Sequence, residues 1–126
     1  MQNSNITLSI VSHGHGGMVE KLLHDIKNND SICKIILTKN IIGENIEYPT
    51  EIAPIIVTIE NTQPKGFSEN HNFAFKEYCD SDFFCVLNPD IRITDNPFPS
   101  LLYCMDSGKC AIAGPMVRDA EGEIQD

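Results

Sequence analysis

The chain has 126 residues, and 9 Lys and Arg against 18 Asp and Glu give it a net charge of −9 at pH 7. This acidic balance argues against a nucleic-acid-binding protein and against a polybasic membrane-surface domain, because both need clustered cations. Hydrophobic residues make up 41% of the chain, which is too many for a disordered acidic protein. No apolar run approaches the ~18 residues of a transmembrane helix. We therefore expect a folded globular chain.

Five cysteines are scattered along the chain without a CxxC pair, and the first residues lack the basic region of a signal peptide. An odd, dispersed set argues against disulfide staples and against a structural zinc site. The sequence therefore predicts reduced thiols in a cytoplasmic protein.

The first half of the chain predicts three strands and one helix. A buried strand over Ile6–Val11 ends at a glycine cluster, and apolar residues at helical spacing follow over Met18–Ile26. Lys34–Thr38 predicts a second short strand. The polar stretch Asn40–Pro54 is typical of a surface excursion, and it leads to a third strand over Ile55–Ile59.

A second helix is predicted beyond the third strand. Ser68 is expected to cap it, and the helix runs through Tyr78. Four aromatic side chains are expected to pack in the core: Phe67 before this helix, Phe73 and Phe75 within it, and Phe98 in the next helix.

The last predicted elements are two strands and the helix between them. Asp82–Leu87 predicts a fourth strand from its apolar run. Asn96 and Pro97 are typical of a helix start, and Gly108 is typical of a helix end. Cys110–Ala113 predicts a fifth strand.

Alternating strands and helices predict an α/β fold, with a mainly parallel sheet that carries helices on both faces. In such sheets, ligands bind outside the carboxyl ends of the strands. Polar residues gather at these ends, in the segments Ser12 to Gly17, Lys39-Asn40, Glu60-Asn61, Lys65 to Asn72 and Asn88-Pro89-Asp90. We expect these loops to converge on one rim and to form a binding site.

The loop after the first strand contains His13 and His15, separated by Gly14. Its glycines permit positive φ and a close backbone approach to a ligand. It matches neither a P-loop nor a dinucleotide-binding fingerprint. Three interpretations stay open here: contact with a ligand, a metal site formed by the two histidines, and a turn whose histidines face solvent.

Asn88-Pro89-Asp90 follows an apolar strand, so it lies at a sheet end. The proline stiffens the turn and biases the residue before it to an extended backbone, which holds Asp90 at a defined place. A single carboxylate cannot build a closed cage, but it can hold Mg²⁺ or Mn²⁺ that takes its other oxygens from water and a diphosphate. The alternative is a simple turn in which Asp90 is solvated.

The run from Gly66 to Asn72 opens the second helix. Asn70 and Asn72 fall in its first turn, where they weaken a helix but can face a ligand. Backbone N–H groups at a helix start also favour anions. The alternative is an ordinary amphipathic helix start.

Five segments carry a family resemblance. In chain order they are ITLSIVSHGHGGMVEKLLHDI, KIILTKN, KGFSENHNFAF, DFFCVLNPDIRI and AIAGPMVRDAEGEIQD, and they cover essentially the whole chain. The chain resembles the first half of a family 2 glycosyltransferase of the GT-A fold, and it looks most similar to the rhamnosyltransferase-like branch. The most specific pair is GF-x-x-x-x-N followed by LNPD.

The resemblance implies that residues 1–126 are the nucleotide-sugar-binding part of a Rossmann-like GT-A domain whose acceptor-binding half is absent. The residues that it places against the nucleotide sugar are Ser12, His13, Gly14, Lys39, Asn40, Gly66, Phe67, Asn72, Asn88 and Asp90. Asp90 is also the implied ligand of a divalent cation, Mg²⁺ or Mn²⁺. That cation would bridge the donor diphosphate and stabilise its departing charge.

Three positions depart from the family pattern. Lys39 stands where relatives commonly carry an aspartate that helps to read the base, so the choice of base is open. Ser12-His13-Gly14 replaces the usual Asn-Tyr-Asn. Asn88 replaces the first carboxylate of the DxD motif, which is normal in this branch. The catalytic base of the family lies in the second half, so no catalytic residue is expected within this chain.

The resemblance implies that the full-length protein is a hexosyltransferase-type enzyme. It would transfer a sugar such as rhamnose from a dTDP- or UDP-sugar to a glycan or lipid-linked glycan, in bacterial cell-surface polysaccharide or lipopolysaccharide assembly. It would work in the cytoplasm, including the inner face of the membrane. The chain alone, as a fragment or a shortened gene product, is expected to bind donor weakly, to transfer no sugar and to expose apolar surface that can drive self-association. The alternative is a non-catalytic nucleotide-binding or interaction module on the same fold.

Overall fold

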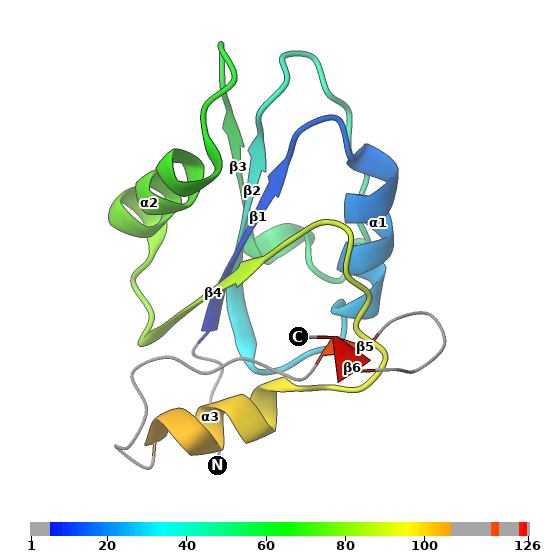
Figure 1. Cartoon of the computed structure of the whole chain (residues 1–126), viewed down its shortest axis with the longest axis vertical. Coiled ribbons are helices and arrows are strands. Elements are labelled where there is room, and N and C mark those ends of the chain that lie inside the picture. Colours follow the sequence, from blue (N-terminus) through cyan, green and yellow to red (C-terminus); the bar gives the residue numbers. More distant parts are fainter. Residues whose placement is uncertain (1–5, 107–116, 119–123, 126) are drawn as a thin grey trace. The chain divides into compact units, whose positions relative to one another are not determined.

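The computed structural model describes residues 6–106, 117–118 and 124–125 (Figure 1). The chain divides into two compact units, Met1–Thr94 and Asp95–Asp126. No helix in these described ranges has both the length and the apolar character needed to cross a membrane.

The first unit is built on a sheet whose strand order is β3-β2-β1-β4, and every neighbouring pair is parallel. The strands are β1 (Ile6–Ser12), β2 (Ile32–Lys39), β3 (Ile56–Glu60), which follows the 3-10 turn η1 (Ala53–Ile55), and β4 (Phe83–Leu87). Two helices, α1 (Gly16–Asp25) and α2 (Phe67–Tyr78), cover opposite faces of the sheet (Figure 1). The expected α/β class, with a parallel sheet and helices on both faces, is confirmed.

Strand β1 is buried almost along its whole length because helices cover both of its faces. Side chains alternate along a strand. Thr7 and Ser9 therefore point to the α2 face, where Ser9 bonds to a helix residue, and Leu8 and Ile10 point to the α1 face. On that second face they meet the buried aliphatic residues of α1, which are Val19, Leu22 and Leu23. The apolar core of the first unit thus lies between β1 and α1.

Helix α2 begins two residues earlier than a cap at Ser68 predicts. Its N-cap is Gly66, whose backbone is extended, and no side chain caps the helix. Asn70 N–H donates to the Gly66 carbonyl at 3.1 Å, which closes the first turn. Ser68 therefore lies inside the helix and is not its cap, so that prediction is wrong.

The expected burial of the α2 aromatic side chains is also wrong. Phe67, Phe73 and Phe75 are 58%, 41% and 55% exposed. The residues of α2 that are buried are Asn70, His71 and Ala74. At 100° per residue, Phe73 and Phe75 fall on the two flanks of this buried face. Polar and small residues hold the centre of the face because the strand beneath presents hydroxyl groups there.

The stretch between β2 and β3 folds back onto the first loop and onto α1. Ser12 Oγ donates to Glu44 Oε2 at 2.5 Å, and Glu47 N–H donates to Glu20 Oε2 at 2.9 Å. Ile46, which belongs to this stretch, is buried. The predicted surface excursion is therefore tied to the rim of the sheet.

The second unit contains α3 (Phe98–Asp106) and a two-stranded antiparallel ladder of β5 (Val117–Arg118) and β6 (Ile124–Gln125). Asn96 Oδ1 accepts the N–H of Phe98 at 3.1 Å, so the predicted helix start is confirmed. Phe98 is 1% exposed, as expected of a core residue. The predicted helix end at Gly108 and the predicted strand over Cys110–Ala113 lie outside the described residues.

Candidate functional site

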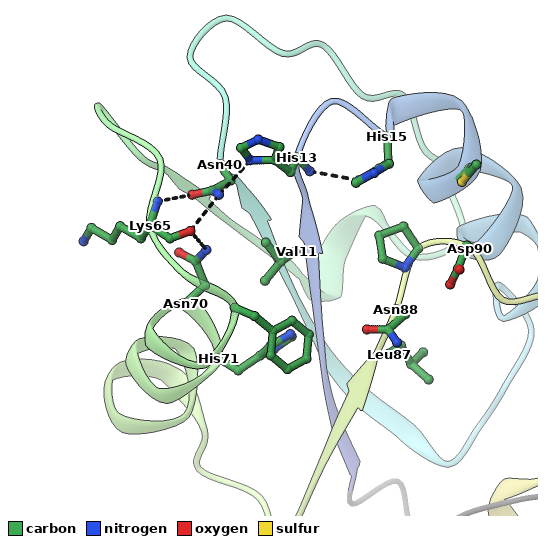
Figure 2. A pocket seen from close by; sticks show the side chains of 13 residues that line it. Val11, His13, His15, Asn40, Lys65, Asn70, His71, Leu87, Asn88 and Asp90 are labelled. Atoms are coloured by element: carbon green, nitrogen blue, oxygen red, sulfur yellow. Dashed lines mark hydrogen bonds between the residues drawn. The ribbon is translucent and has the colours of Figure 1, made fainter. Parts of the chain in front are cut away.

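A cavity of about 500 Å³ opens beyond the carboxyl ends of β1, β2 and β4 and beside the start of α2 (Figure 2). It is lined by Val11, His13, His15, Met18, Asn40, Lys65, Phe67, Asn70, His71, Leu87, Asn88, Pro89 and Asp90. In Figure 2, His13, Asn40 and Lys65 lie on one side of Val11, and Asn88 and Asp90 lie on the other. The predicted convergence of loops on one rim of the sheet is therefore observed.

Half of the residues that the resemblance placed against a nucleotide sugar line this cavity. They are His13, Asn40, Phe67, Asn88 and Asp90. The residues that are not among the lining residues are Ser12, Gly14, Lys39, Gly66 and Asn72. Residues two apart in a helix lie about 200° apart around its axis, so Asn70 and Asn72 cannot face one site together. Asn70 is the one that faces the cavity, and Asn72 is exposed. The binding role of all ten stays a prediction.

Asn40 is the centre of a buried hydrogen-bond network. Its Oδ1 accepts from Asn61 Nδ2 and from the N–H of Lys65, both at 2.8 Å. Its Nδ2 donates to the Lys65 carbonyl and to His13 Nδ1, both at 2.9 Å. An amide has two donor and two acceptor positions, and all four are used. A ligand that bonds to this amide must therefore displace an existing partner.

The same network joins the loop after β3 to α2. Asn61 Nδ2 also donates to Asn70 Oδ1 at 2.8 Å, and Asn70 Nδ2 donates to the Lys65 carbonyl at 3.3 Å. The Lys65 backbone is thereby fixed on both sides of its Cα, through its N–H and through its carbonyl. Its ammonium group points away from these partners and lies 5.4 Å from the centre of the Phe73 ring. The network therefore organises the cavity wall, while the charge of Lys65 rests on an exposed aromatic face.

The turn after β1 sets the tautomers of two histidines. Gly14 has φ of +80°, a left-handed conformation that favours glycine. His13 Nδ1 accepts from the Asn40 amide, and His15 Nδ1 accepts from the N–H of His13 at 3.2 Å. In a neutral imidazole whose Nδ1 accepts, Nε2 carries the proton. Both rings therefore offer an N–H donor at Nε2.

Ser12 holds this turn through two hydrogen bonds. Its Oγ accepts the N–H of His15 at 3.1 Å while its own proton goes to Glu44. The other carboxylate oxygen, Glu44 Oε1, is buried and has no hydrogen-bond partner among the described residues. Because the Ser12 hydroxyl is buried, donates to Glu44 and accepts from His15, its role in this structure is to shape the loop that carries the histidines.

His71 forms the floor of the cavity. Its Nδ1 lies 2.8 Å from Ser9 Oγ, and both side chains are buried. The Phe67 ring packs edge-on against the imidazole, with 4.5 Å between centroids. Burial lowers the pKa of His71 from its ordinary value of 6.5, because the charged ring would lose its hydration. The floor is therefore polar and neutral.

The sequence predicted that Asn70 can face a ligand, but it assigned no individual role to Lys65 or His71 of the same polar run. A signal was present in Thr7 and Ser9, which alternate with Leu8 and Ile10 in an otherwise apolar strand. Two buried hydroxyl groups on one strand face require polar partners from the covering helix.

Asn88, Pro89 and Asp90 form a turn at the end of β4. The N–H of Ile91 donates to the Asn88 carbonyl at 3.4 Å, and Asp90 is exposed. Asp90 is the single carboxylate among the residues that line the cavity. The described part of the chain contains no group of three His, Cys, Asp or Glu side chains that could hold a metal. Within these residues, His13 and His15 have no third side chain of these types beside them.

No family model matches this chain, and neither does any curated protein. Among solved structures, the chain is similar to the mannosyltransferase PcManGT from Pyrobaculum calidifontis, determined in complex with GDP-Man and Mn²⁺. The TM-score is 0.67 at 12% sequence identity, and the match covers 94% of this chain and 37% of that chain. The chain thus spans little more than a third of that protein. The likeness shows that this chain shares the Rossmann-like α/β fold of that part of the mannosyltransferase.

Proposed function

We propose that this chain binds a nucleotide-diphosphate sugar and forms the donor-binding part of a glycosyltransferase. The observation that carries the proposal is the cavity at the carboxyl ends of the parallel strands, with Asn88-Pro89-Asp90 on one wall and His13 and Asn40 on the other. This is the edge of an open α/β sheet where ligands bind. The similar mannosyltransferase was determined with GDP-Man and Mn²⁺, a donor and a cation of the same classes.

The residues at the cavity fit a divalent cation that is shared with the donor. One exposed carboxylate, Asp90, cannot enclose Mg²⁺ or Mn²⁺, but these ions readily keep waters and phosphate oxygens in their coordination shell. Bound there, the cation would supply charge stabilisation to the departing diphosphate. The net charge of −9 makes this contribution important, since an acidic chain repels an anionic donor.

The two histidines complement that arrangement with hydrogen-bond donors. His13 and His15 present Nε2–H groups, which pair with phosphate, ribose or base oxygens. Lys39 stands where relatives commonly carry a carboxylate, and it is not among the lining residues. The choice of base therefore stays open, and we retain a dTDP- or UDP-sugar as the proposed donor.

The finer assignment follows from the sequence resemblance. We propose membership of family 2, in its rhamnosyltransferase-like branch, with a glycan or lipid-linked acceptor of a bacterial cell surface. We place the protein in the cytoplasm or at the inner face of the membrane. Among the described residues, Asp90 is the one carboxylate that lines the cavity, and we propose that the catalytic base comes from outside this set.

The proposal is tested by titrating the purified chain with UDP, dTDP and GDP, each with Mn²⁺ and with a chelator. We expect saturable binding that strengthens with Mn²⁺, and we expect Asp90→Asn to remove the Mn²⁺-dependent gain. The matched control is Asp80→Asn, since Asp80 is an exposed carboxylate outside the cavity. If the folded chain binds none of the three nucleotides at millimolar concentration, the proposal fails.

A second candidate function is a nucleotide-binding module without catalysis. The fully engaged amide of Asn40 and the single carboxylate at the cavity favour it, because both describe a shaped pocket with little catalytic equipment. This candidate predicts nucleotide binding of equal strength with and without Mn²⁺ and no loss in Asp90→Ala. A cation-dependent loss in that variant would remove it.

A further inference from the structure

The turn that carries Asp90 is tied to the far end of α1 through one carboxylate. Asp25 Oδ2 accepts from Arg92 Nε at 2.8 Å and from the N–H of Ile93 at 2.9 Å. Asp25 Oδ1 accepts from a terminal nitrogen of the same guanidinium at 2.8 Å. Both oxygens are used, and the Asp25 side chain is only 12% exposed. Three hydrogen bonds thus join the end of a helix to the segment two to three residues beyond Asp90.

The position of Asp25 is unfavourable for a helix considered alone. It is the last residue of α1, where the partial negative charge of the helix terminus repels a carboxylate. The Arg92 guanidinium, which donates in parallel to both oxygens, offsets this repulsion. Its hydrogen bonds hold the pKa of Asp25 below its ordinary value even though burial acts in the opposite direction. An acidic residue at this position does not stabilise the helix. Asp25 is instead explained by its hydrogen bonds to the segment that follows Asp90.

A second ion pair in the same unit shows what an ordinary surface contact looks like. Lys34 Nζ lies 3.2 Å from Asp80 Oδ1, and the Asp80 side chain is 80% exposed. That pair has one charged contact and no backbone donor to the carboxylate. Exposed pairs of this kind contribute little. The Asp25–Arg92 pair differs in its two parallel hydrogen bonds, in the low exposure of its carboxylate and in the backbone N–H that the carboxylate also accepts, although Arg92 itself is 56% exposed.

We propose that Asp25 and Arg92 are positioning residues that fix the direction in which Asp90 presents its carboxylate to the cation and diphosphate. This rests on the proposed function. The turn is held on one side by β4 and on the other by the Asp25 contacts, which leaves Asp90 a short segment between two fixed points. Two residues of chain span at most about 7 Å, so release of Arg92 and Ile93 gives Asp90 freedom on the scale of a metal–ligand contact.

The test uses the full chain and the variants Asp25→Asn and Arg92→Gln, with Asp80→Asn as the matched control from the exposed pair. The measured quantity is the ratio of UDP and GDP dissociation constants with chelator and with Mn²⁺. Partners that orient a metal ligand typically contribute about tenfold to affinity, so we expect the ratio to fall about tenfold in both variants. Binding of the nucleosides uridine and guanosine, which carry no diphosphate, should stay at the wild-type value.

Three further readouts distinguish positioning from a general loss of structure. The double variant should lose no more than either single variant, because both remove the same contact. Arg92→Lys should fall between wild type and Arg92→Gln, since an ammonium cannot donate in parallel to both carboxylate oxygens. Amide hydrogen exchange of residues 91–94 in the ligand-free protein should accelerate in Asp25→Asn and stay unchanged in Asp80→Asn.

The outcomes separate this inference from the proposed function. A wild-type chain whose nucleotide affinity does not respond to Mn²⁺ overturns the cation role of Asp90, and with it the proposed purpose of the pair. A wild-type response that persists at full size in folded Asp25→Asn and Arg92→Gln overturns the positioning role while the proposed function stands. Unchanged amide exchange in Asp25→Asn overturns it without any ligand.

Discussion

The two faces of the sheet are packed by different kinds of contact. On the α1 face, Leu8 and Ile10 of β1 meet aliphatic side chains, and the contact is apolar throughout. On the α2 face, Ile36 and Ala74 are buried beside hydroxyl, amide and imidazole groups, several of which form hydrogen bonds, such as Ser9 with His71. Apolar packing stabilises without fixing directions, whereas hydrogen bonds fix directions at a smaller net gain. The cavity accordingly adjoins the face whose side chains have defined orientations.

The largest effect is expected from the apolar face. Leu22→Ala should lower the free energy of unfolding by about 2–5 kcal/mol, because it removes a fully buried side chain and leaves a cavity. Urea denaturation measures this loss, and Lys21→Ala on the exposed side of the same helix is the control. The nucleotide affinity of the folded fraction should be unchanged. If affinity falls with stability, the two faces are not independent.

A somewhat smaller loss is expected from the amide network. Asn40→Ala removes four hydrogen bonds and leaves buried partners unpaired, so we expect a loss of about 2–3 kcal/mol. Unlike the apolar variant, it should also weaken nucleotide binding, because the Lys65 peptide and the His13 ring lose their support. Asn72→Ala, at an exposed position of α2, should change stability by less than about 0.5 kcal/mol. Equal losses in both variants would contradict the network.

The buried imidazole of His71, on the α2 face, predicts that the free energy of unfolding depends on pH. The pKa of His71 is lowered in the folded state from its ordinary value of 6.5, so the unfolded chain binds the proton more readily. Stability should be complete above pH 6.5 and should fall as the pH drops through the folded-state pKa. His71→Gln keeps a hydrogen bond to Ser9 and should flatten the slope in urea titrations at pH values between about 7.5 and 5. An unchanged slope would mean that other titratable groups cause the pH dependence of the free energy of unfolding.

The smallest effect is expected from the exposed aromatic side chains. Phe73→Ala removes a ring that is 41% exposed and a cation–π contact with Lys65. We expect a loss of about 0.5 kcal/mol in the free energy of unfolding. Thermal melts against Phe98→Ala, whose side chain is 1% exposed, provide the contrast. A loss from Phe73→Ala as large as that of the buried residue would show that the flank of α2 is covered in solution.

The sequence predicted the elements of the first unit because their signals are local. Apolar β-branched runs gave β1 and β2, and helical spacing gave α1. The same reasoning failed for Phe67, Phe73 and Phe75, since a helix period shows that one face is buried but does not say what lies opposite. In α2 the opposite surface carries hydroxyl groups, so polar residues took the buried positions.

The candidate site was predictable in its location and only partly in its members. Loops after parallel strands meet at one edge, and this rule alone placed His13, Asn40, Asn88 and Asp90 at the cavity. The pairing of Asp25 with Arg92 could not be predicted, because the two residues are 67 positions apart and the family resemblance assigns neither of them a role. Such contacts depend on the register of the whole sheet, which a single sequence does not specify.

The backbone ladder of the sheet continues beyond the assigned strands. Asn40 N–H donates to the Ser12 carbonyl at 2.8 Å, and Asn61 N–H donates to the Lys39 carbonyl at 3.0 Å. Two residues of the cavity's supporting network are therefore held by the same kind of bond that holds the core. A ligand entering the cavity meets a wall that is already ordered, so its association should carry a small conformational-entropy penalty and proceed with little rearrangement of the backbone.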